Sequence, residues 1–138
     1  MAGVVYNPYL NEVFYAIKDG GAYCNGKQIH VSDSDLSNAL ILFGTSPYDK
    51  NLSERTFQLA AQYLSQGLDL RRSGSAALDL CTVAAGRAEL YFELQTSPWD
   101  FAAGKLIVEE AGGVVTTLDG EELSFYKKSS ILAKNKVI

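Results

Sequence analysis

The sequence has few residues of the kinds that build zinc sites or disulfide frameworks. Its 138 residues contain one histidine and two cysteines, Cys24 and Cys81. A structural zinc site needs about four such ligands, so a zinc-stabilised domain is excluded. Two cysteines also do not make the disulfide framework of a small secreted domain. We therefore expect a reducing compartment, the cytoplasm.

Long hydrophobic runs and an excess of positive charge are also missing. The longest apolar stretches, such as 39–43, are as long as a strand and much shorter than a membrane-spanning helix. The first residues lack the basic region and apolar core of a signal peptide. Acidic residues outnumber basic ones by 16 to 12, whereas proteins that track nucleic-acid phosphates usually show the opposite imbalance. We expect no membrane segment and no nucleic-acid partner.

The composition is that of an ordinary globular domain. Hydrophobic residues make up 47% of the chain and charged residues 20%, which excludes disordered and low-complexity classes. A chain of this length can bury roughly two thirds of the surface that its unfolded state exposes. A self-sufficient hydrophobic core is therefore expected.

The first quarter of the chain has the pattern of an antiparallel β meander. Segments rich in β-forming residues cover 4–6, 12–18, 22–24 and 27–31. Asp19-Gly20-Gly21 and Asn25-Gly26 supply turn signals between them, because glycine and asparagine tolerate positive φ. We predict that residues 1–36 form this meander, as part of a first sheet.

The rest of the chain, 37–138, alternates strands with helices. Strands are expected over 39–43, 68–72, 89–93, 114–117 and 131–133, and helices over 76–85, over 100–111 and in a first segment that ends at about 66. Asn51 or Ser53 can cap the first helix, whose expected buried face carries Phe57, Ala60, Ala61 and Leu64. Such alternation predicts an α/β fold with a mixed, mostly parallel sheet flanked by helices on both faces.

The first strand-to-helix junction with suggestive chemistry is the segment 71–77. It places the small residues Gly74, Ser75 and Ala76 at the start of a helix. Backbone N–H groups at such a start can approach an anion, and the helix dipole favours negative charge there. From the spacing alone we favour an ordinary turn at Gly74 followed by a Ser75 cap, because a capping serine is the commonest way to begin a helix.

The second such junction lies between Glu93, which ends a strand, and Asp100, which opens a helix. Both carboxylates can converge above the sheet edge, where ligands gather in α/β sheets. Carboxylate oxygens are hard ligands of the kind that Mg²⁺ prefers. From spacing alone, however, Asp100 is explained by helix capping, because one aspartate does not make a metal site.

Other candidates carry less chemistry. The remaining strand-to-helix connection, 44–49, reads as an ordinary polar loop, and no role is assigned to it. Cys81 lies within an apolar helix and reads as buried and inert. His30 is the single imidazole and is expected to be structural or solvated, so no base–nucleophile pair can be assembled from it.

Five ordered motifs add a family resemblance that covers nearly the whole chain. They are RRSGSAALDL (71–80), VAAGR (83–87), YFE (91–93), PWDFAAG (98–104) and EAGG (110–113). In this order they resemble the C-terminal half of the inositol monophosphatase family. The segments GVVYNP (3–8) and GGAYCNG (20–26) are similar to that family's middle section.

The resemblance implies a layered αβαβα fold and a Mg²⁺-dependent phosphomonoesterase, commonly dimeric. By position, Asp100 matches a carboxylate that binds a metal ion and a substrate hydroxyl, and Glu93 matches one that binds inositol hydroxyls. Gly74, Ser75 and Ala76 match a backbone segment that contacts substrate. The implied substrate is inositol monophosphate or a similar polyol or sugar phosphate, cleaved by a metal-activated water.

One departure from the family pattern is large. The family's other metal ligands lie in an upstream Glu-Glu pair followed by an Asp-Pro-x-Asp-Gly-Thr loop, and that combination does not occur here. Asp100 alone should bind Mg²⁺ weakly, because this ion needs convergent ligands. We therefore expect the C-terminal part of an enzyme, inactive by itself and partnered by a missing N-terminal half or a second copy.

Two alternatives stay open. The chain could be a short non-catalytic binding or interaction module with the same fold, since its acidic balance leaves protein partners open. It could also be part of a bisphosphate nucleotidase or fructose bisphosphatase relative, because these families share the layered fold.

Overall fold

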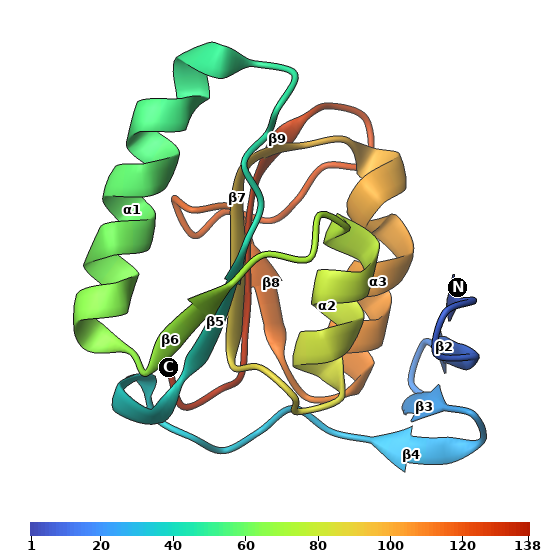
Figure 1. Cartoon of the computed structure of the whole chain (residues 1–138). Helices are drawn as coiled ribbons and strands as arrows, with labels where there is room; N and C mark the ends of the chain where they lie inside the picture. Colours follow the sequence, from blue (N-terminus) through green and yellow to red (C-terminus); the bar gives the residue numbers. More distant parts are fainter.

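The chain begins with a four-stranded antiparallel sheet in the computed structural model, which describes residues 1–138 (Figure 1). Its strands, in spatial order, are β1 (Ala2–Asn7), β2 (Glu12–Ile17), β3 (Ala22–Cys24) and β4 (Lys27–Ile29). Asn25 and Gly26 have φ values of 49° and 81°, as a two-residue hairpin turn between β3 and β4 requires. The predicted meander is confirmed, and we call it the meander sheet.

A second sheet of five strands follows. Its strands are β5 (Leu40–Phe43), β6 (Asp69–Arg71), β7 (Leu90–Thr96), β8 (Val114–Thr116) and β9 (Ser129–Lys134), in the order β6-β5-β7-β9-β8. Strand β5 is parallel to both β6 and β7, whereas β9 is antiparallel to both β7 and β8. Four strands thus point one way and β9 the other, because β8 reaches β9 through a loop without a crossover helix. The sheet is mixed, as predicted.

Three α-helices complete the fold (Figure 1). They are α1 (Ser53–Gln66), α2 (Ala76–Ala84) and α3 (Pro98–Glu110). Two short 3-10 helices, η1 (Leu36–Asn38) and η2 (Lys50–Leu52), precede β5 and α1. Helix α1 lies on one face of the second sheet, and α2 and α3 lie on the other, between the two sheets. The layers are therefore the meander sheet, the α2–α3 pair, the second sheet and α1. None of the helices combines the length and the apolar character that crossing a bilayer requires.

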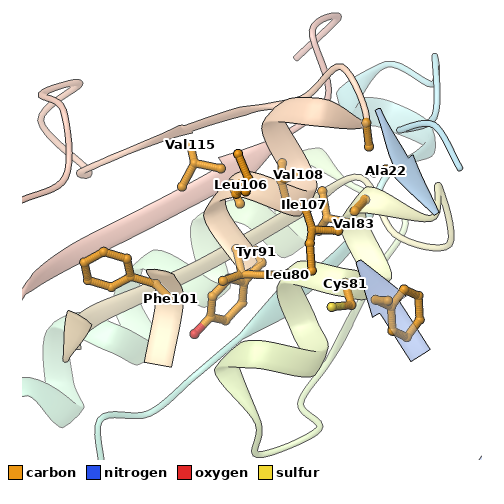
Figure 2. Packing of buried hydrophobic residues seen from close by; sticks show 14 of the residues in the cluster. Ala22, Leu80, Cys81, Val83, Tyr91, Phe101, Leu106, Ile107, Val108 and Val115 are labelled. Carbon is orange, nitrogen blue, oxygen red and sulfur yellow. The ribbon is translucent and has the colours of Figure 1, made fainter. Parts of the chain in front are cut away.

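The main hydrophobic core surrounds α2 and α3 (Figure 2). It joins Leu80 of α2 and Ile107 of α3 to Phe14 of the meander sheet and Tyr91 of the second sheet. Cys81 is fully buried in it, and burial raises the pKa of this thiol to about 12, as expected for an inert cysteine. Since both sheets contribute to one continuous core, each sheet is held in place by the same helix pair.

The buried face of α1 differs from the prediction. Ala60 is buried against the second sheet, as predicted, and Thr56 is buried with it, whereas Phe57 and Leu64 are 57% and 47% exposed and Ala61 is exposed as well. The small residues bring the helix close to the sheet, and Tyr63 then packs its ring against Phe92 at 5.2 Å. The face of α1 that packs on the sheet is therefore rotated about the helix axis relative to the predicted one.

The start of α1 was also predicted incorrectly. Neither Asn51 nor Ser53 caps the helix; Asp49 instead accepts a hydrogen bond from the Asn51 N–H and caps the preceding 3-10 turn. The chain thus enters α1 through η2, and Asp49 is held at the end of the loop that follows β5.

The outer face of the meander sheet is apolar, and no helix or second sheet packs on it. Side chains alternate along a strand, so the residues that do not face α2 and α3 point away from the core. These outward residues include Val4, Tyr6, Val13 and Ile17, which are between 36% and 61% exposed. We call them the outer apolar face.

Candidate functional site

A polar cleft of about 440 Å³ lies where strands β5, β6 and β7 end. Its walls are the loop 44–49 after β5, the segment 72–76 before α2, the end of β7 and the start of α3. Three of its 18 lining residues are hydrophobic, so the cleft suits a polar ligand. Ligands of α/β sheets gather at such strand ends because helix N-termini and loops converge there.

All five residues predicted for the site line this cleft. They are Gly74, Ser75, Ala76, Glu93 and Asp100. The two junctions singled out in the sequence are thus brought together in one cleft. Their roles stay predictions at this point.

Segment 74–76 forms the turn into α2. Gly74 has a φ of 90°, and the Ser75 side chain accepts a hydrogen bond from the Leu78 N–H at 3.3 Å. Ser75 therefore caps the helix, as the simpler interpretation had it. Ala76 and Ala77 lie in the first turn, where no intrahelical carbonyl is available for their N–H groups. These groups can still bind an anion, so capping and binding are compatible here.

Glu93 is held from two sides. Its Oε2 accepts the Ser46 N–H at 3.0 Å, and its Oε1 accepts the hydroxyl of the buried Tyr91 at 2.7 Å. Burial raises the pKa of Tyr91 well above its ordinary value, and the charge of Glu93 raises it further. Tyr91 therefore stays protonated and remains a hydrogen-bond donor throughout the physiological pH range.

The loop 44–49 is part of the site, which corrects its assignment as an ordinary connection. Gly44, Thr45 and Ser46 all line the cleft, and Ser46 is buried against the Glu93 carboxylate. One signal was available in the sequence, since this loop also follows a parallel strand and must reach the same sheet edge.

Asp100 lies within the first turn of α3 rather than at its start. The helix begins two residues earlier, at Pro98, because proline fits the first helical position, where its missing N–H is not needed. Asp100 Oδ2 accepts the Ser97 N–H at 3.1 Å. Asp100 is thus a capping residue whose second oxygen, Oδ1, stays available to the cleft.

Asp79 is a cleft residue that the sequence prediction missed. Its side chain is 2% exposed, and it accepts a hydrogen bond from the Ser73 hydroxyl at 2.7 Å. Burial raises its pKa to about 6, and the charge of Glu93 adds to that rise, while Ser73 and Arg72 oppose it. The one carboxylate in the mostly apolar helix 76–84 was the available signal.

Two cations also border the cleft. Arg72 donates a hydrogen bond to the Thr45 hydroxyl at 3.2 Å, and Lys128 reaches the cleft from the loop before β9. Both side chains are exposed and complement the negative charge of a phosphate.

The chain's own residues do not complete a magnesium site. No three side chains among its one histidine and its cysteines, aspartates and glutamates lie together so that they could hold a metal ion. Mg²⁺ requires near-octahedral oxygen coordination, usually from one or two carboxylates with waters and substrate phosphate oxygens. Asp100 offers one oxygen toward the cleft, so further ligands would have to come from elsewhere.

Known proteins match this chain in sequence and in structure. The chain is 46% identical over 126 residues to inositol monophosphatase 2 of Solanum lycopersicum, covering 88% of this chain and 47% of the relative. It is 39% identical over 133 residues to a putative Nus factor SuhB of Neisseria meningitidis, covering 96% of this chain and 51% of the relative. A solved inositol monophosphatase from Anabaena superposes with a TM-score of 0.91 at 40% identity, covering 99% of this chain and 54% of that one.

The chain therefore spans about half the length of these relatives. The sequence model of the inositol monophosphatase family matches residues 1–138. The fold, with its meander sheet, helix pair and five-stranded mixed sheet, agrees with that family. The chain belongs to the inositol monophosphatase family.

Proposed function

We propose that this chain forms the substrate-facing part of a Mg²⁺-dependent phosphomonoesterase that acts on inositol monophosphate or a similar polyol or sugar phosphate. The observation that carries the proposal is the convergence of the α2 N-terminus, Glu93 and Asp100 in one polar cleft. Family membership and the name of the tomato relative favour inositol monophosphate within this class.

The phosphate end of the substrate lies at the start of α2 in this proposal. The N–H groups of Ala76 and Ala77 donate to phosphate oxygens, and the positive end of the helix dipole favours the anion. Arg72 and Lys128 at the border of the cleft add positive charge. These groups orient the ester so that its leaving oxygen points toward Asp100 and Glu93.

The polyol end of the substrate lies against the two carboxylates. Glu93 and Asp100 accept hydrogen bonds from ring hydroxyls, since ionised carboxylates act only as acceptors. Hydroxyl donors paired with a carboxylate form the stronger, charge-assisted type of hydrogen bond. The hydroxyl pattern of the substrate is therefore recognised by this pair.

Magnesium, when bound, would activate the attacking water and stabilise the leaving oxygen. Asp100 Oδ1 is the ligand that this chain would contribute. We propose that the other ligands come from the part of the relatives that this chain does not cover, and that the chain alone does not hydrolyse phosphate esters. We also propose a reducing cytoplasmic location, because both cysteines are free thiols.

The test is phosphate release from inositol 1-phosphate by the purified chain, alone and mixed with the half of the Anabaena enzyme that it does not cover. We expect Mg²⁺-dependent release from the mixture only, and its loss with Asp100→Asn. Release by the chain alone would overturn its proposed inactivity. Two halves that co-purify without releasing phosphate would overturn the proposed hydrolysis.

A second candidate function is protein binding through the outer apolar face. The exposed side chains of Val4, Tyr6 and Ile17 support it, and so does the relative named as a Nus factor. Two substitutions distinguish the binding function from the phosphatase function. A binding module would retain a protein partner after Asp100→Asn and lose it after Val4→Lys, whereas the phosphatase proposal predicts loss of phosphate release in the first variant.

A further inference from the structure

We infer that Gly44 and Ser46, in the loop after β5, are positioning residues that fix the Glu93 carboxylate so that one of its oxygens recognises a substrate hydroxyl. The inference rests on the proposed function and specifies how the cleft selects a polyol phosphate over a phosphate ester without hydroxyl groups. The side-chain hydrogen bonds of Ser46 go to Glu93 and Gln95 and none goes to Arg72 or to segment 74–76, where the phosphate is placed.

Gly44 leaves the space that the carboxylate fills. A Cβ built at Gly44 would overlap Glu93 Oε1 and its carboxyl carbon, so any side chain at this position would displace the Glu93 carboxylate. The Gly44 N–H donates to the Phe92 carbonyl at 3.0 Å, which continues the pairing of β5 with β7. This hydrogen bond holds the start of the loop beside β7. Gly44 has no positive φ, so its lack of a side chain, and not its backbone freedom, is what the site uses.

Ser46 holds the other side of the carboxylate. Its N–H donates to Glu93 Oε2 at 3.0 Å, and its backbone has a φ of 45°, a left-handed conformation that few residues other than glycine adopt. The Ser46 hydroxyl accepts the Gln95 N–H at 3.1 Å and lies 3.0 Å from the Gln95 carbonyl. It thereby ties the loop to β7 and keeps the Ser46 N–H aimed at Glu93.

An irregularity in β7 makes this tie available. The pairing of β7 with β9 shifts between Glu93 and Thr96, so the backbone of Gln95 lies outside the regular ladder. Its N–H and carbonyl are satisfied by the Ser46 hydroxyl instead. β-bulges are common beside active sites, where they redirect side chains.

The remaining hydrogen-bonding capacity of Glu93 defines the ligand. A carboxylate has about four lone-pair positions, two on each oxygen. Oε2 accepts the Ser46 N–H and is also within 3.2 Å of its hydroxyl, while Oε1 accepts only the Tyr91 hydroxyl. Because the Ser46 hydroxyl gives its one hydrogen to the Gln95 carbonyl, each Glu93 oxygen keeps one position for a further donor. The chemistry that fits these positions is a hydroxyl, or two neighbouring hydroxyls, beside the phosphate ester.

The experiment titrates the full chain with two probes, myo-inositol and inorganic phosphate, and follows the backbone amides by NMR. For the wild-type chain we expect phosphate to shift Ser75 and Ala76, and myo-inositol to shift Ser46. Gly44→Ala should weaken myo-inositol binding about tenfold, as loss of a charge-assisted hydrogen bond would, and leave phosphate binding unchanged. Ser46→Gly removes the hydroxyl, tolerates positive φ, and should act in the same direction.

Controls separate positioning from structure. Gly20→Ala, a matched change in an exposed turn, should alter neither titration. Glu93→Gln should weaken myo-inositol binding by itself, and adding Gly44→Ala should then have little further effect, because both changes act on one interaction. Additive losses in the double variant would overturn the inference.

The remaining outcomes are also decisive. Equal weakening of both probes by Gly44→Ala would show a structural role and overturn the inference. Wild-type binding of phosphate without myo-inositol would overturn the inference while leaving the phosphate site of the proposed function intact. Binding of neither probe would overturn the proposed function and, with it, the hydroxyl site.

Discussion

The Tyr91 hydroxyl donates to Glu93 Oε1 at 2.7 Å, across two residues of the same strand. Residues two apart on a strand share one face, so the fully buried Tyr91 ring supports a side chain that reaches the cleft. The hydrophobic core and the cleft are thereby connected by one hydrogen bond. A substitution of Tyr91 in the core should therefore alter the position of the Glu93 carboxylate in the cleft.

Tyr91→Phe tests that connection. The substitution keeps the ring and removes the hydroxyl, and we expect it to lower the free energy of unfolding by about 1.5 kcal/mol, because a carboxylate loses a donor. Urea denaturation of both proteins measures the change. Tyr126→Phe, at a side chain that is 96% exposed, is the control and should change nothing. An unchanged stability in Tyr91→Phe would mean that the bond contributes nothing net.

Asp79 should make the chain less stable as pH rises. Its pKa is raised from 3.8 to about 6, so the folded state keeps a proton that the unfolded state has already released. The free energy of unfolding should therefore fall between pH 4 and pH 6 and stay low above that range, by about 3 kcal/mol in total.

Asp79→Asn removes this titration. The variant should show a flatter pH dependence and a higher stability than the wild-type chain at pH 7.5, measured by urea denaturation at pH 4.5 and 7.5. Asp33→Asn, at an exposed position, is the matched control. An equally steep pH dependence in Asp79→Asn would show that the slope arises from other groups.

Arg87 should not be replaceable by lysine. Its guanidinium binds both oxygens of Glu12, at 2.8 and 2.6 Å, and lies 5.8 Å from the centre of the Phe14 ring. The hydrogen bond from Arg87 is the main cause that lowers the pKa of Glu12. A lysine cannot form the two-pronged contact, so Arg87→Lys should cost about 1 kcal/mol of stability.

Thermal unfolding of Arg87→Lys and of Arg55→Lys measures this difference. Arg55 is exposed on α1 and should tolerate the change. Since the Glu12 carboxylate is stabilised in its charged form, the Arg87 contribution should disappear as pH falls through the lowered pKa of Glu12. A loss that persists in full in strong acid would argue for packing on Phe14 instead.

Gly104→Ala should disturb the packing of α2 against α3. A Cβ at Gly104 would lie 2.6 Å from Leu80 Cδ1 and 2.7 Å from Leu80 Cβ, closer than real contacts allow. Overpacking of this kind should cost about 2 kcal/mol despite the better helix propensity of alanine. Adding Leu80→Ala should recover part of the loss in urea denaturation. No recovery would show that the strain lies elsewhere.

The sequence was sufficient to predict the fold class and most elements, for reasons that are local. Asn25-Gly26 and Asp19-Gly20-Gly21 are turns whose backbone conformations few other residues adopt, so their positions in the meander were predictable. The five residues predicted for the site line one cleft because the parallel strands that precede them end at the same sheet edge. The residue motifs and the strand topology therefore predict the same site at this sheet edge.

What the sequence did not show depends on tertiary contacts. Ser46 looks like any loop serine until the irregular end of β7 presents the Gln95 backbone to it. Asp79 looks like a helix-start acid until packing buries it. The orientation of α1 was missed because Thr56 is only weakly hydrophobic; Ala60 is buried as predicted, but Thr56 and not Phe57 is buried with it.

Strand β1 is the last strand on its side of the meander sheet, and its six residues hydrogen-bond only to β2. An open edge of this length is a template for another strand, and in concentrated solution it favours edge-to-edge aggregation. Val4 is 61% exposed on this strand, so a single lysine there would place a charge beside the edge without touching the core. The same position would be a practical first choice for keeping the purified chain dispersed at the concentrations that NMR requires.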